Sequence, residues 1–315
     1  MYKNCKIAVV VPAYNEERQI SKVITTMPVF VDHIVIIDDA SKDGTSAAVM
    51  DFAAKDSRIV LLRHEKNKGV GGAIATGYKW ARDNSIDAAA VMAGDGQMHP
   101  EDLPALLDPV IDEGVHYAKG NRLIHRAVSD SMPTVRFLGN SMLSMLTKIA
   151  SGYWHIADSQ TGYTVINKEA LATIDWDQMY QRYGQPNDLL VTLNVFQMRV
   201  RDVPIQPLYN VGERSDLRIH RVLFTISMLL LRRFLWRMKE RYIVRDFHPL
   251  VFFYALGTML MLTTLMLFVR LIVLWIRNGE APVLTAVAMM MLGSIGLQSI
   301  FFAMWFDMDT NRHLR

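Results

Sequence analysis

The sequence of 315 residues contains a single cysteine, Cys5, and therefore has no internal disulfide framework. One thiol fits a reducing compartment. We expect no secretory signal peptide, because residues 1–6 are polar and the apolar run Ile7–Val11 is too short for the hydrophobic part of one. The turn after this run is not glycine-rich, which excludes a dinucleotide-binding or P-loop fingerprint at that point.

Charge is absent from two long stretches, residues 249–269 and residues 281–306. Each is long enough to cross a hydrocarbon core of ~30 Å at ~1.5 Å per helical residue. We expect two transmembrane helices, Pro249 to about Ile276 and Pro282–Phe306. A buried helical hairpin in a soluble protein is the alternative.

Positive charge is scarce in the first two thirds of the chain. Residues 1–210 carry a net charge of −3, and residues 211–315 carry +6. A nucleic-acid-binding protein would place its positive charge on the folded domain, so we expect no nucleic acid partner. Residues 219–245 hold seven Lys and Arg and one acidic residue, interleaved with apolar side chains. This composition predicts amphipathic helix on an anionic membrane surface.

Lys and Arg are frequent before the first span and after the second, and only Arg277 lies in the turn between the spans. The positive-inside rule then places both termini in the cytoplasm. We expect a multi-pass protein of the plasma membrane, or inner membrane, with a cytoplasmic catalytic domain. The expected parts are a catalytic domain (1–212), amphipathic interface helices (213–247) and a transmembrane hairpin with a short tail (248–315).

Four short apolar runs alternate with helical segments, which is typical of an α/β protein with a mostly parallel, doubly wound sheet. The runs are Ile7–Val11, Ile34–Ile37, Ile59–Leu62 and Ala88–Met92. Tyr117–Ala118 is a further expected strand, and Val203–Tyr209 an expected edge strand. Expected helices include one capped by Thr45 or Ser46, then Phe137–Ala150 and Leu189–Gln197.

Polar residues follow three of the strands, at 12–17, 38–45 and 95–99. The carboxyl ends of strands in open α/β sheets are where ligands bind. Asp38 could accept hydrogen bonds from a base or ribose, and Tyr14 could pack on a base. Asp95 could hold a divalent cation against a diphosphate. The alternative for Asp38 is ordinary turn and capping chemistry.

Four motifs occur in order: Pro-Ala-Tyr-Asn-Glu-Glu (12–17), Asp-Asp-Ala-Ser-Lys-Asp-Gly-Thr (38–45), Asn-Lys-Gly-Val-Gly-Gly-Ala (67–73) and Gly-Asp-Gly-Gln-Met-His-Pro (94–100). Together they resemble glycosyltransferase family 2, the inverting enzymes with the Rossmann-like GT-A fold. The two spans make the chain most similar to polyprenyl-phosphate glycosyltransferases, such as dolichyl-phosphate mannosyltransferases and undecaprenyl-phosphate glucosyltransferases.

The resemblance implies a donor site and a metal site. Its nucleotide-binding residues are Pro12, Ala13, Tyr14, Glu16, Asp38, Asp39, Lys68 and Gly71. Asp95, also a catalytic candidate, and Gln97 are the implied ligands of Mg²⁺ or Mn²⁺. Ala93 stands where many relatives carry the first Asp of an Asp-x-Asp pair. Diphosphate oxygens and water could complete the coordination, since Mg²⁺ commonly keeps several waters.

The resemblance also implies an acceptor site. Its phosphate-binding residues are Arg122, Arg136, Ser141, Arg214 and Arg218. Guanidinium groups bind phosphate oxygens in a bidentate manner, although Arg122 could equally be an exposed loop residue. Asp158 is the candidate base or acceptor-orienting group. Asp188 is a second candidate, with an ordinary helix N-cap as its alternative.

The expected activity is inverting transfer of a sugar from a UDP- or GDP-sugar to a polyprenyl phosphate at a membrane. A phosphate acceptor has a second pKa of ~6 and barely needs a base. One alternative is transfer to a sugar hydroxyl of a glycolipid or polysaccharide, which does need one. Another is a non-catalytic, membrane-tethered nucleotide-sugar-binding protein, for which Ala93 is the only hint. A homo-oligomer is compatible with the sequence.

Overall fold

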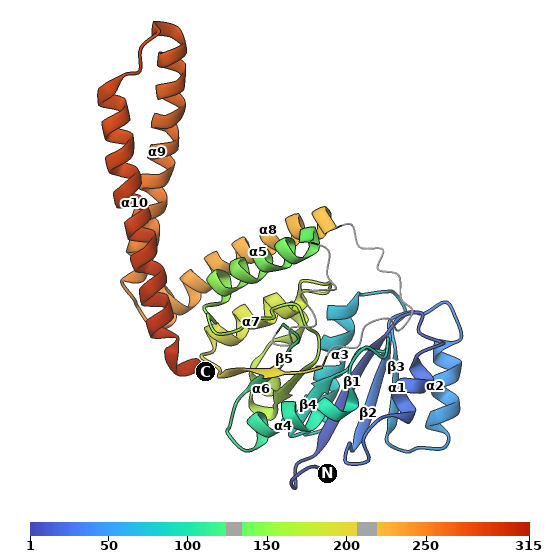
Figure 1. The fold of residues 1–315 in the computed structure, drawn as a ribbon. Helices are drawn as coiled ribbons and strands as arrows, with labels where there is room; N and C mark the ends of the chain where they lie inside the picture. The colour runs from blue at the N-terminus through green and yellow to red at the C-terminus, as the bar shows by residue number, and fades with distance from the viewer. Residues whose placement is uncertain (124–133, 207–218) are drawn as a thin grey trace. The chain divides into compact units, whose positions relative to one another are not determined.

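The computed structural model of the chain describes residues 1–123, 134–206 and 219–315, with the backbone alone for 134–140 and 219–223 (Figure 1). It divides into two compact units. The first comprises Met1–Phe234 together with Leu314–Arg315, and the second comprises Leu235–His313.

The described part of the first unit contains a seven-stranded sheet in the order β3-β2-β1-β4-β6-β5-β7. The strands are β1 Ile7–Ala13, β2 His33–Asp38, β3 Ile59–Arg63, β4 Ala88–Val91, β5 Tyr117–Asn121, β6 Thr164–Asn167 and β7 Val200–Pro204. β6 runs antiparallel to β4 and β5, and the other pairs are parallel. The predicted mostly parallel sheet is confirmed. The sequence patterns did not predict β6, and the edge strand β7 begins three residues earlier than expected.

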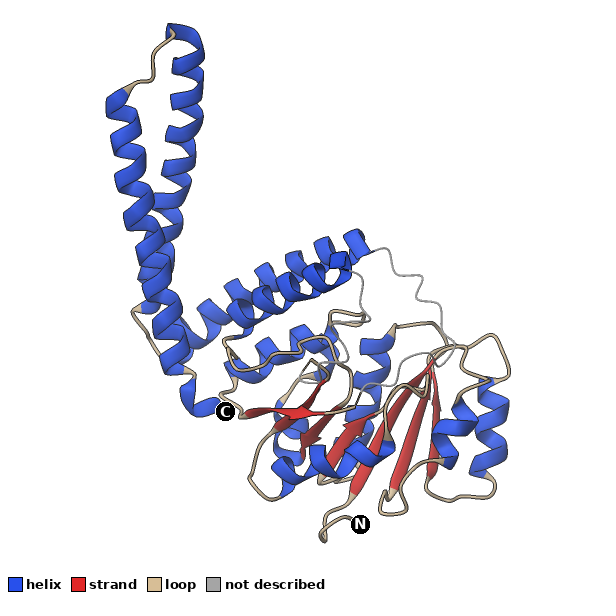
Figure 2. Cartoon of the chain, viewed as in Figure 1, coloured by secondary structure: helices blue, strands red, loops and turns tan. Residues whose placement is uncertain are grey.

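Helices cover both faces of the sheet (Figure 2). The helices between β1 and β7 in the chain are α1 Ile20–Thr25, α2 Thr45–Ala53, α3 Val70–Asp83, α4 Leu103–Ile111, α5 Thr134–Ser151, α6 Lys168–Thr173 and α7 Gln185–Val195. Short 3₁₀ turns lie at Pro100–Asp102, Trp176–Gln178 and Arg312–Leu314.

Two hydrophobic cores lie on opposite faces of the sheet. Ala8 and Val10 of β1 pack in the core that contains α3, α6 and α7 residues. Ile7 and Val9 belong to the other core, with residues of α1, α2 and α4. Every residue of β1 is buried. Burial on both faces explains why the parallel strands are continuous apolar runs rather than alternating ones.

The expected cap of α2 is wrong by one or two positions. Gly44 is the N-cap residue, and Thr45 and Ser46 lie inside the helix. The side chain of Asp43 replaces the expected cap, because its Oδ1 accepts the N–H of Thr45 at 3.1 Å. A Cβ on Gly44 would lie 2.5 Å from Oε1 of Glu17, so a larger residue there would require the exposed side chain of Glu17 to move.

The second unit is helical. α8 Ile219–Lys239 begins in the first unit and continues as a π-helical turn, Glu240–Arg245. α9 Leu250–Asn278 and α10 Val283–Thr310 follow, and both are long and apolar enough to cross a membrane, as predicted. The buried side chains of Arg237 and Asp307 form a bidentate ion pair with N···O distances of 3.1 and 2.9 Å.

Candidate active site

The loops that follow β1 and β2 are joined by hydrogen bonds. The N–H of Asn15 donates to Oγ of Ser41, and the N–H of Lys42 donates to Oδ1 of Asn15, both at 2.9 Å. Asn15 has a φ of 58°, a left-handed conformation that Asn tolerates better than most residues. The two loops therefore form one continuous edge at the carboxyl ends of the strands.

The predicted nucleotide-binding residues of the first loop differ in exposure. Pro12 and Ala13 end β1 and are buried. The side chain of Tyr14 is 44% exposed, so its ring can pack against a base. The N–H of Glu16 donates to Oγ1 of Thr45 at 2.9 Å, which adds a further link to the second loop. Their contacts with a nucleotide stay predictions.

Asp38 is fully buried at the end of β2. Its carboxylate accepts hydrogen bonds from the N–H of Ser41 at 2.8 Å and from Oγ of Ser46. Burial would raise the pKa of Asp38, but these hydrogen bonds outweigh burial and lower the pKa. Nε of Arg63 lies 3.6 Å from its Oδ2. The carboxylate of Asp38 is therefore ionised and hydrogen-bonded to Ser41 and Ser46, with the exposed guanidinium of Arg63 close to it.

Asp39 organises the start of α3. Its carboxylate accepts the N–H of Lys68 at 2.8 Å and the N–H of Gly69 at 2.7 Å. Nδ1 of His64 lies 2.7 Å from its Oδ1, and Nε2 of His64 lies 2.9 Å from Oγ1 of Thr76. The predicted donor residue Lys68 is thus held through its backbone, and its side chain stays exposed.

The glycine cluster before and in α3 packs against another loop. A Cβ on Gly71 would overlap the carbonyl oxygen of Tyr180 and would lie 2.8 Å from Cβ of Gln185. The N–H of Gly72 donates to the carbonyl of Gln181 at 3.1 Å. These contacts give Gly71 a packing role in this structure, and a nucleotide contact at this glycine stays a prediction.

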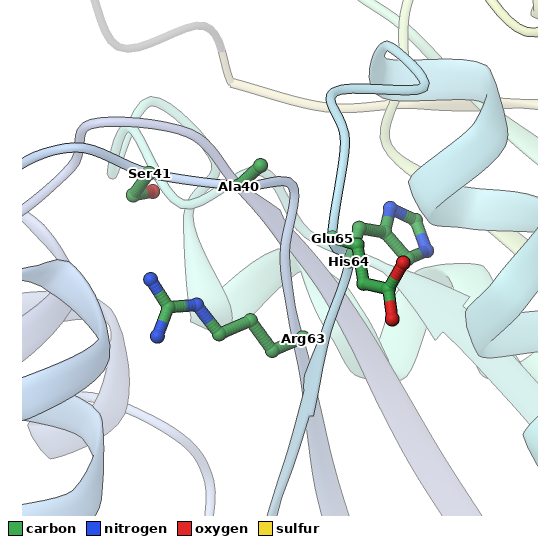
Figure 3. Close-up of a pocket in the computed structure, with 5 residues that line it drawn as sticks. All are labelled: Ala40, Ser41, Arg63, His64 and Glu65. Atoms are coloured by element: carbon green, nitrogen blue, oxygen red, sulfur yellow. The ribbon is translucent and has the colours of Figure 1, made fainter.

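An open pocket of about 450 Å³ lies beyond the ends of β2 and β3. It is lined by Ala40, Ser41, Arg63, His64 and Glu65. The side chain of Arg63 extends below the turn formed by Ala40 and Ser41 (Figure 3). The side chains of His64 and Glu65 point to the opposite side from that of Arg63. Hydrogen-bond donors such as Arg63 and an acceptor, Glu65, therefore line a pocket next to the predicted nucleotide-binding residues Asp38 and Asp39.

The Asp95 loop abuts the end of β1. The N–H of Gly94 donates to the carbonyl of Pro12 at 3.1 Å, and a Cβ on Gly94 would lie 3.3 Å from that of Ala13. Oδ1 of Asp95 accepts the N–H of Gln97 at 3.0 Å. Burial raises the pKa of Asp95, and no ion pair with a side chain of the described residues opposes it.

The donor atoms of Asp95 and Gln97 fit a magnesium or manganese ion. Carboxylate and amide oxygens are the hard ligands that such cations prefer. Within residues 1–123, 134–206 and 219–315, no group of three His, Cys, Asp or Glu side chains could hold a metal, and Ala93 contributes no carboxylate. A bound cation would offset the cost of ionising the half-buried Asp95, so two protein ligands with diphosphate oxygens and water form a consistent set.

Asp158 and Arg122, predicted to have separate roles, form an ion pair between a buried carboxylate and a partly exposed guanidinium. Nε of Arg122 lies 2.7 Å from Oδ2 of Asp158, and its terminal nitrogen lies 3.2 Å from Oδ1. Burial would raise the pKa of Asp158, but Arg122 and then Lys119 outweigh it, so the pKa is lowered. A carboxylate in this state is a poor general base, which favours the orienting role of Asp158.

Sequence reasoning missed two charged residues next to this pair. Lys119 of β5 is fully buried and donates from Nζ to the carbonyl of Thr161. Oδ2 of Asp202 accepts Nδ2 of Asn121 and the N–H of Ala157, both at 2.8 Å. The register of β5 and β7 sets Lys119 opposite Asp202. The only signal in the sequence was a lysine directly after the short expected strand Tyr117–Ala118.

Asp188 is neither an N-cap nor an exposed base. α7 begins at Gln185, three residues before it, which corrects the expected start at Leu189. Its Oδ2 accepts the N–H of Tyr180 at 2.8 Å and pairs with the guanidinium of Arg233 at 2.9 Å. Burial raises the pKa of Asp188 despite Arg233. Its oxygens hold α7 against its neighbours.

The remaining predicted acceptor residues are only partly described. Ser141 lies on α5 and is exposed. Arg136 also lies on α5, where the structure describes its backbone but not its side chain. Arg214 and Arg218 lie outside the described residues. Their predicted phosphate contacts stay predictions.

The sequence and the fold both have known counterparts. One curated relative is the UDP-N-acetylglucosamine–dolichyl-phosphate N-acetylglucosaminyltransferase of Methanococcus voltae, 31% identical over 216 residues that cover 64% of this chain and 86% of the relative. The undecaprenyl-phosphate mannosyltransferase of Micrococcus luteus is 27% identical over 203 residues, or 64% of this chain and 82% of the relative.

A crystal structure of glucosyl-3-phosphoglycerate synthase from Mycobacterium tuberculosis, in complex with Mn²⁺, UDP and glucosyl-3-phosphoglycerate, superposes with a TM-score of 0.54. It is 18% identical and covers 74% of this chain and 80% of that chain, a likeness that shows the fold. The model of the family named glycosyl transferase family 2 matches residues 8–175. With the predicted GT-A-like sheet and the motif loops at its carboxyl edge in place, this chain belongs to glycosyltransferase family 2 and is an enzyme.

Proposed function

We propose that this enzyme transfers a sugar, with inversion, from a UDP- or GDP-sugar to a polyprenyl phosphate at the cytoplasmic face of a membrane. The observation that carries the acceptor half is the bidentate pair of Arg122 and Asp158. A hydroxyl acceptor would need a general base, whereas Asp158 is ion-paired with a lowered pKa. A phosphate dianion needs no base and is the natural ligand of a guanidinium.

In the proposed reaction an oxygen of the acceptor phosphate forms a bond to C1 of the sugar. The bond from C1 to the nucleoside diphosphate breaks on the opposite side, which inverts the configuration. Asp158 keeps Arg122 aimed at the attacking phosphate. The edge that carries Tyr14 and Asp38 holds the nucleotide. A divalent cation held by Asp95 and Gln97 would supply positive charge beside the departing diphosphate.

The membrane part of the proposal comes from the C-terminal third. α9 and α10 have the length and composition of membrane spans, and residues 219–245 are strongly basic and apolar. Two relatives are named as transferases that act on dolichyl phosphate and undecaprenyl phosphate. A lipid phosphate that stays in the bilayer suits an enzyme anchored in the same bilayer.

A second candidate function is a membrane-tethered nucleotide-sugar-binding protein without activity. Ala93 and the small metal donor set favour it, because one carboxylate ligand is missing. It predicts nucleotide binding without any transfer.

The decisive test incubates the full-length protein in detergent with labelled UDP- and GDP-sugars and a short polyprenyl phosphate. The matched control acceptor is the corresponding polyprenol, which has a hydroxyl in place of the phosphate. We expect one of the donors to give a labelled lipid when polyprenyl phosphate is the acceptor and none when polyprenol is. Mild acid should release the label from this lipid. Transfer to polyprenol or to added oligosaccharide would contradict the proposed acceptor. Binding of UDP or GDP without transfer from any donor would support the second candidate.

A further inference from the structure

Lys119 is a buried cation to which the proposed reaction gives no role. Its side chain has no exposed surface, and its Nζ donates to the carbonyl of Thr161. In the sheet it lies opposite Thr164 of β6 and Asp202 of β7. Burying an ammonium group is costly unless charged partners compensate it.

Those partners are two carboxylates that flank Lys119. Asp158 and Asp202 both attract its charge, whereas Arg122, which is hydrogen-bonded to Asp158, repels it. Oδ1 of Asp202 is buried and has no hydrogen-bond partner among the described residues, so this carboxylate depends on the nearby ammonium. The order Asp202, Lys119, Asp158, Arg122 alternates in sign and is neutral as a whole.

The consequence concerns what happens when Arg122 binds another anion. Arg122 is the partly exposed member of the row, with 36% of its side chain accessible, while Asp158 is almost fully buried. If Arg122 turns to an incoming phosphate, Asp158 loses its bidentate partner. Only Lys119 then remains to compensate the buried carboxylate. Without Lys119, Asp158 would retain Arg122 more tightly.

We propose that Lys119 is a positioning residue that compensates Asp158 and so allows Arg122 to bind the acceptor phosphate. The inference rests on the proposed function, because it requires a phosphate acceptor. It adds a residue that none of the predicted site positions included.

The protonation of Lys119 gives the inference a measurable signature. Burial lowers the pKa of Lys119 to about 8, with Asp158 and Asp202 opposing the shift and Arg122 adding to it. The charge is therefore present below this pH and is lost above it. Acceptor affinity should fall as the pH rises through about 8. Removing the negative charge of Asp202 should move this fall to lower pH.

The experiment measures KM for a short polyprenyl phosphate between about pH 6 and pH 10, with the affinity for UDP and GDP measured in parallel. The proteins are the full-length wild type, Lys119→Met, Lys119→Arg and Asp202→Asn. The control is Lys79→Met, which makes the same chemical change in the exposed ion pair of Lys79 with Asp177. Circular dichroism and thermal unfolding report on folding.

We expect Lys119→Met to raise KM for the lipid about tenfold or more with nucleotide affinity unchanged. Lys119→Arg should restore most of the affinity and lack the alkaline fall. Asp202→Asn should shift the fall to lower pH, and Lys79→Met should match wild type. If Lys119→Met does not fold, the wild-type and Asp202→Asn profiles decide by themselves.

A folded Lys119→Met variant with wild-type KM overturns the inference, as does a wild-type profile that is flat through pH 8 and unmoved in Asp202→Asn. In both cases transfer to the lipid continues and the proposed function stands. A wild type that transfers sugar to polyprenol instead of polyprenyl phosphate overturns the proposed function, and the inference with it.

Discussion

Asp95 is a half-buried carboxylate and Asp158 a buried one, and their surroundings shift their pKa values in opposite directions. Burial raises the pKa of Asp95, and no cationic side chain of the described residues forms an ion pair with it. Arg122 and Lys119 more than offset burial at Asp158, so its pKa is lowered. Environments that separate the pKa values of two carboxylates commonly separate their roles. An external cation would compensate the charge of Asp95, whereas Asp158 already has Arg122 as its counter-ion.

Asp95→Asn should lower kcat for sugar transfer by at least about a hundredfold, because the only carboxylate of the 93–97 loop is lost. The same change should stabilise the fold near neutral pH. A group whose folded pKa is raised destabilises the folded state once it ionises, so the wild type loses stability as pH rises through that pKa. Thermal unfolding of both proteins at acidic and neutral pH checks this.

The control for Asp95→Asn is Asp51→Asn, which changes an exposed aspartate of α2. It should leave both activity and unfolding temperature unchanged. Near wild-type turnover in Asp95→Asn would remove Asp95 from the metal site. A variant stabilised equally at acidic and neutral pH would show that ionisation of Asp95 is not the cause.

Asp158→Asn should slow transfer to a lipid phosphate because Arg122 loses its bidentate partner. Its pH–rate profile should keep the acid limb near ~6 that belongs to the phosphate itself. The wild type should also lose more stability in acid than the variant, since a lowered pKa stabilises the folded state at higher pH and that stability is lost as pH falls. Measuring kcat against pH for both proteins tests the chemistry. Disappearance of the acid limb in the variant would identify Asp158 as the base for a hydroxyl acceptor.

At the scale of elements, α3 connects the predicted nucleotide loops to the segment before α7. Asp39 holds the backbone just before the helix, and Gly71 lies in its first turn against Tyr180. A glycine-rich helix start would read as a phosphate cradle in a dinucleotide-binding protein. Here the missing side chains make room for another loop.

Gly71→Ala should therefore destabilise the fold by about 1–3 kcal/mol, because the added Cβ overlaps the carbonyl of Tyr180. The control is Gly162→Ala, whose added Cβ would meet only Cε of Met98 at 3.4 Å, an ordinary contact. Chemical denaturation with and without UDP or GDP separates the two roles of Gly71. Unchanged stability together with weakened nucleotide binding would make Gly71 a nucleotide ligand after all.

The sequence was sufficient to predict β1 to β4 because each contains a continuous apolar run, which in β1, β2 and β4 is buried. The loops that follow β1 and β2 also meet as expected, since parallel strands bring their carboxyl ends together. β6 escaped prediction because its four residues, Thr164–Asn167, contain only two apolar side chains and pair with strands far away in the sequence.

The pairing of site residues could not be predicted. Arg122 and Asp158 are 36 residues apart and meet only because β5 and β6 are neighbours in the sheet. Lys119 was overlooked because a lysine in a sequence is usually exposed. The carbonyl of Thr161 and the carboxylates of Asp158 and Asp202, all distant in the sequence, explain how this one is buried.

At the scale of the whole molecule, charge and hydrophobicity divide the chain in the same place. The first 210 residues are slightly acidic, while the remainder carries a net charge of +6 and both apolar helices. The compact units divide within α8, at Phe234. The catalytic loops and the membrane-spanning candidates therefore lie in different units of one chain, and the orientation of the spans fixes the compartment in which the proposed donor is used.

The orientation of the spans can be tested by cysteine labelling, because the chain contains a single native cysteine, Cys5. Cys5→Ser removes the only thiol, so a single introduced cysteine reports on one position. In this background Glu280→Cys marks the exposed turn between α9 and α10, and Lys55→Cys marks an exposed position of the first unit.

The positive-inside rule favours a cytoplasmic location for both ends of the hairpin, since Arg277 is the only Lys or Arg near the turn. A membrane-impermeant maleimide should therefore label Glu280→Cys in right-side-out vesicles and Lys55→Cys only in inside-out vesicles. Labelling of Lys55→Cys from outside would place the catalytic unit away from the cytoplasmic pool of nucleotide sugars and contradict the proposed location.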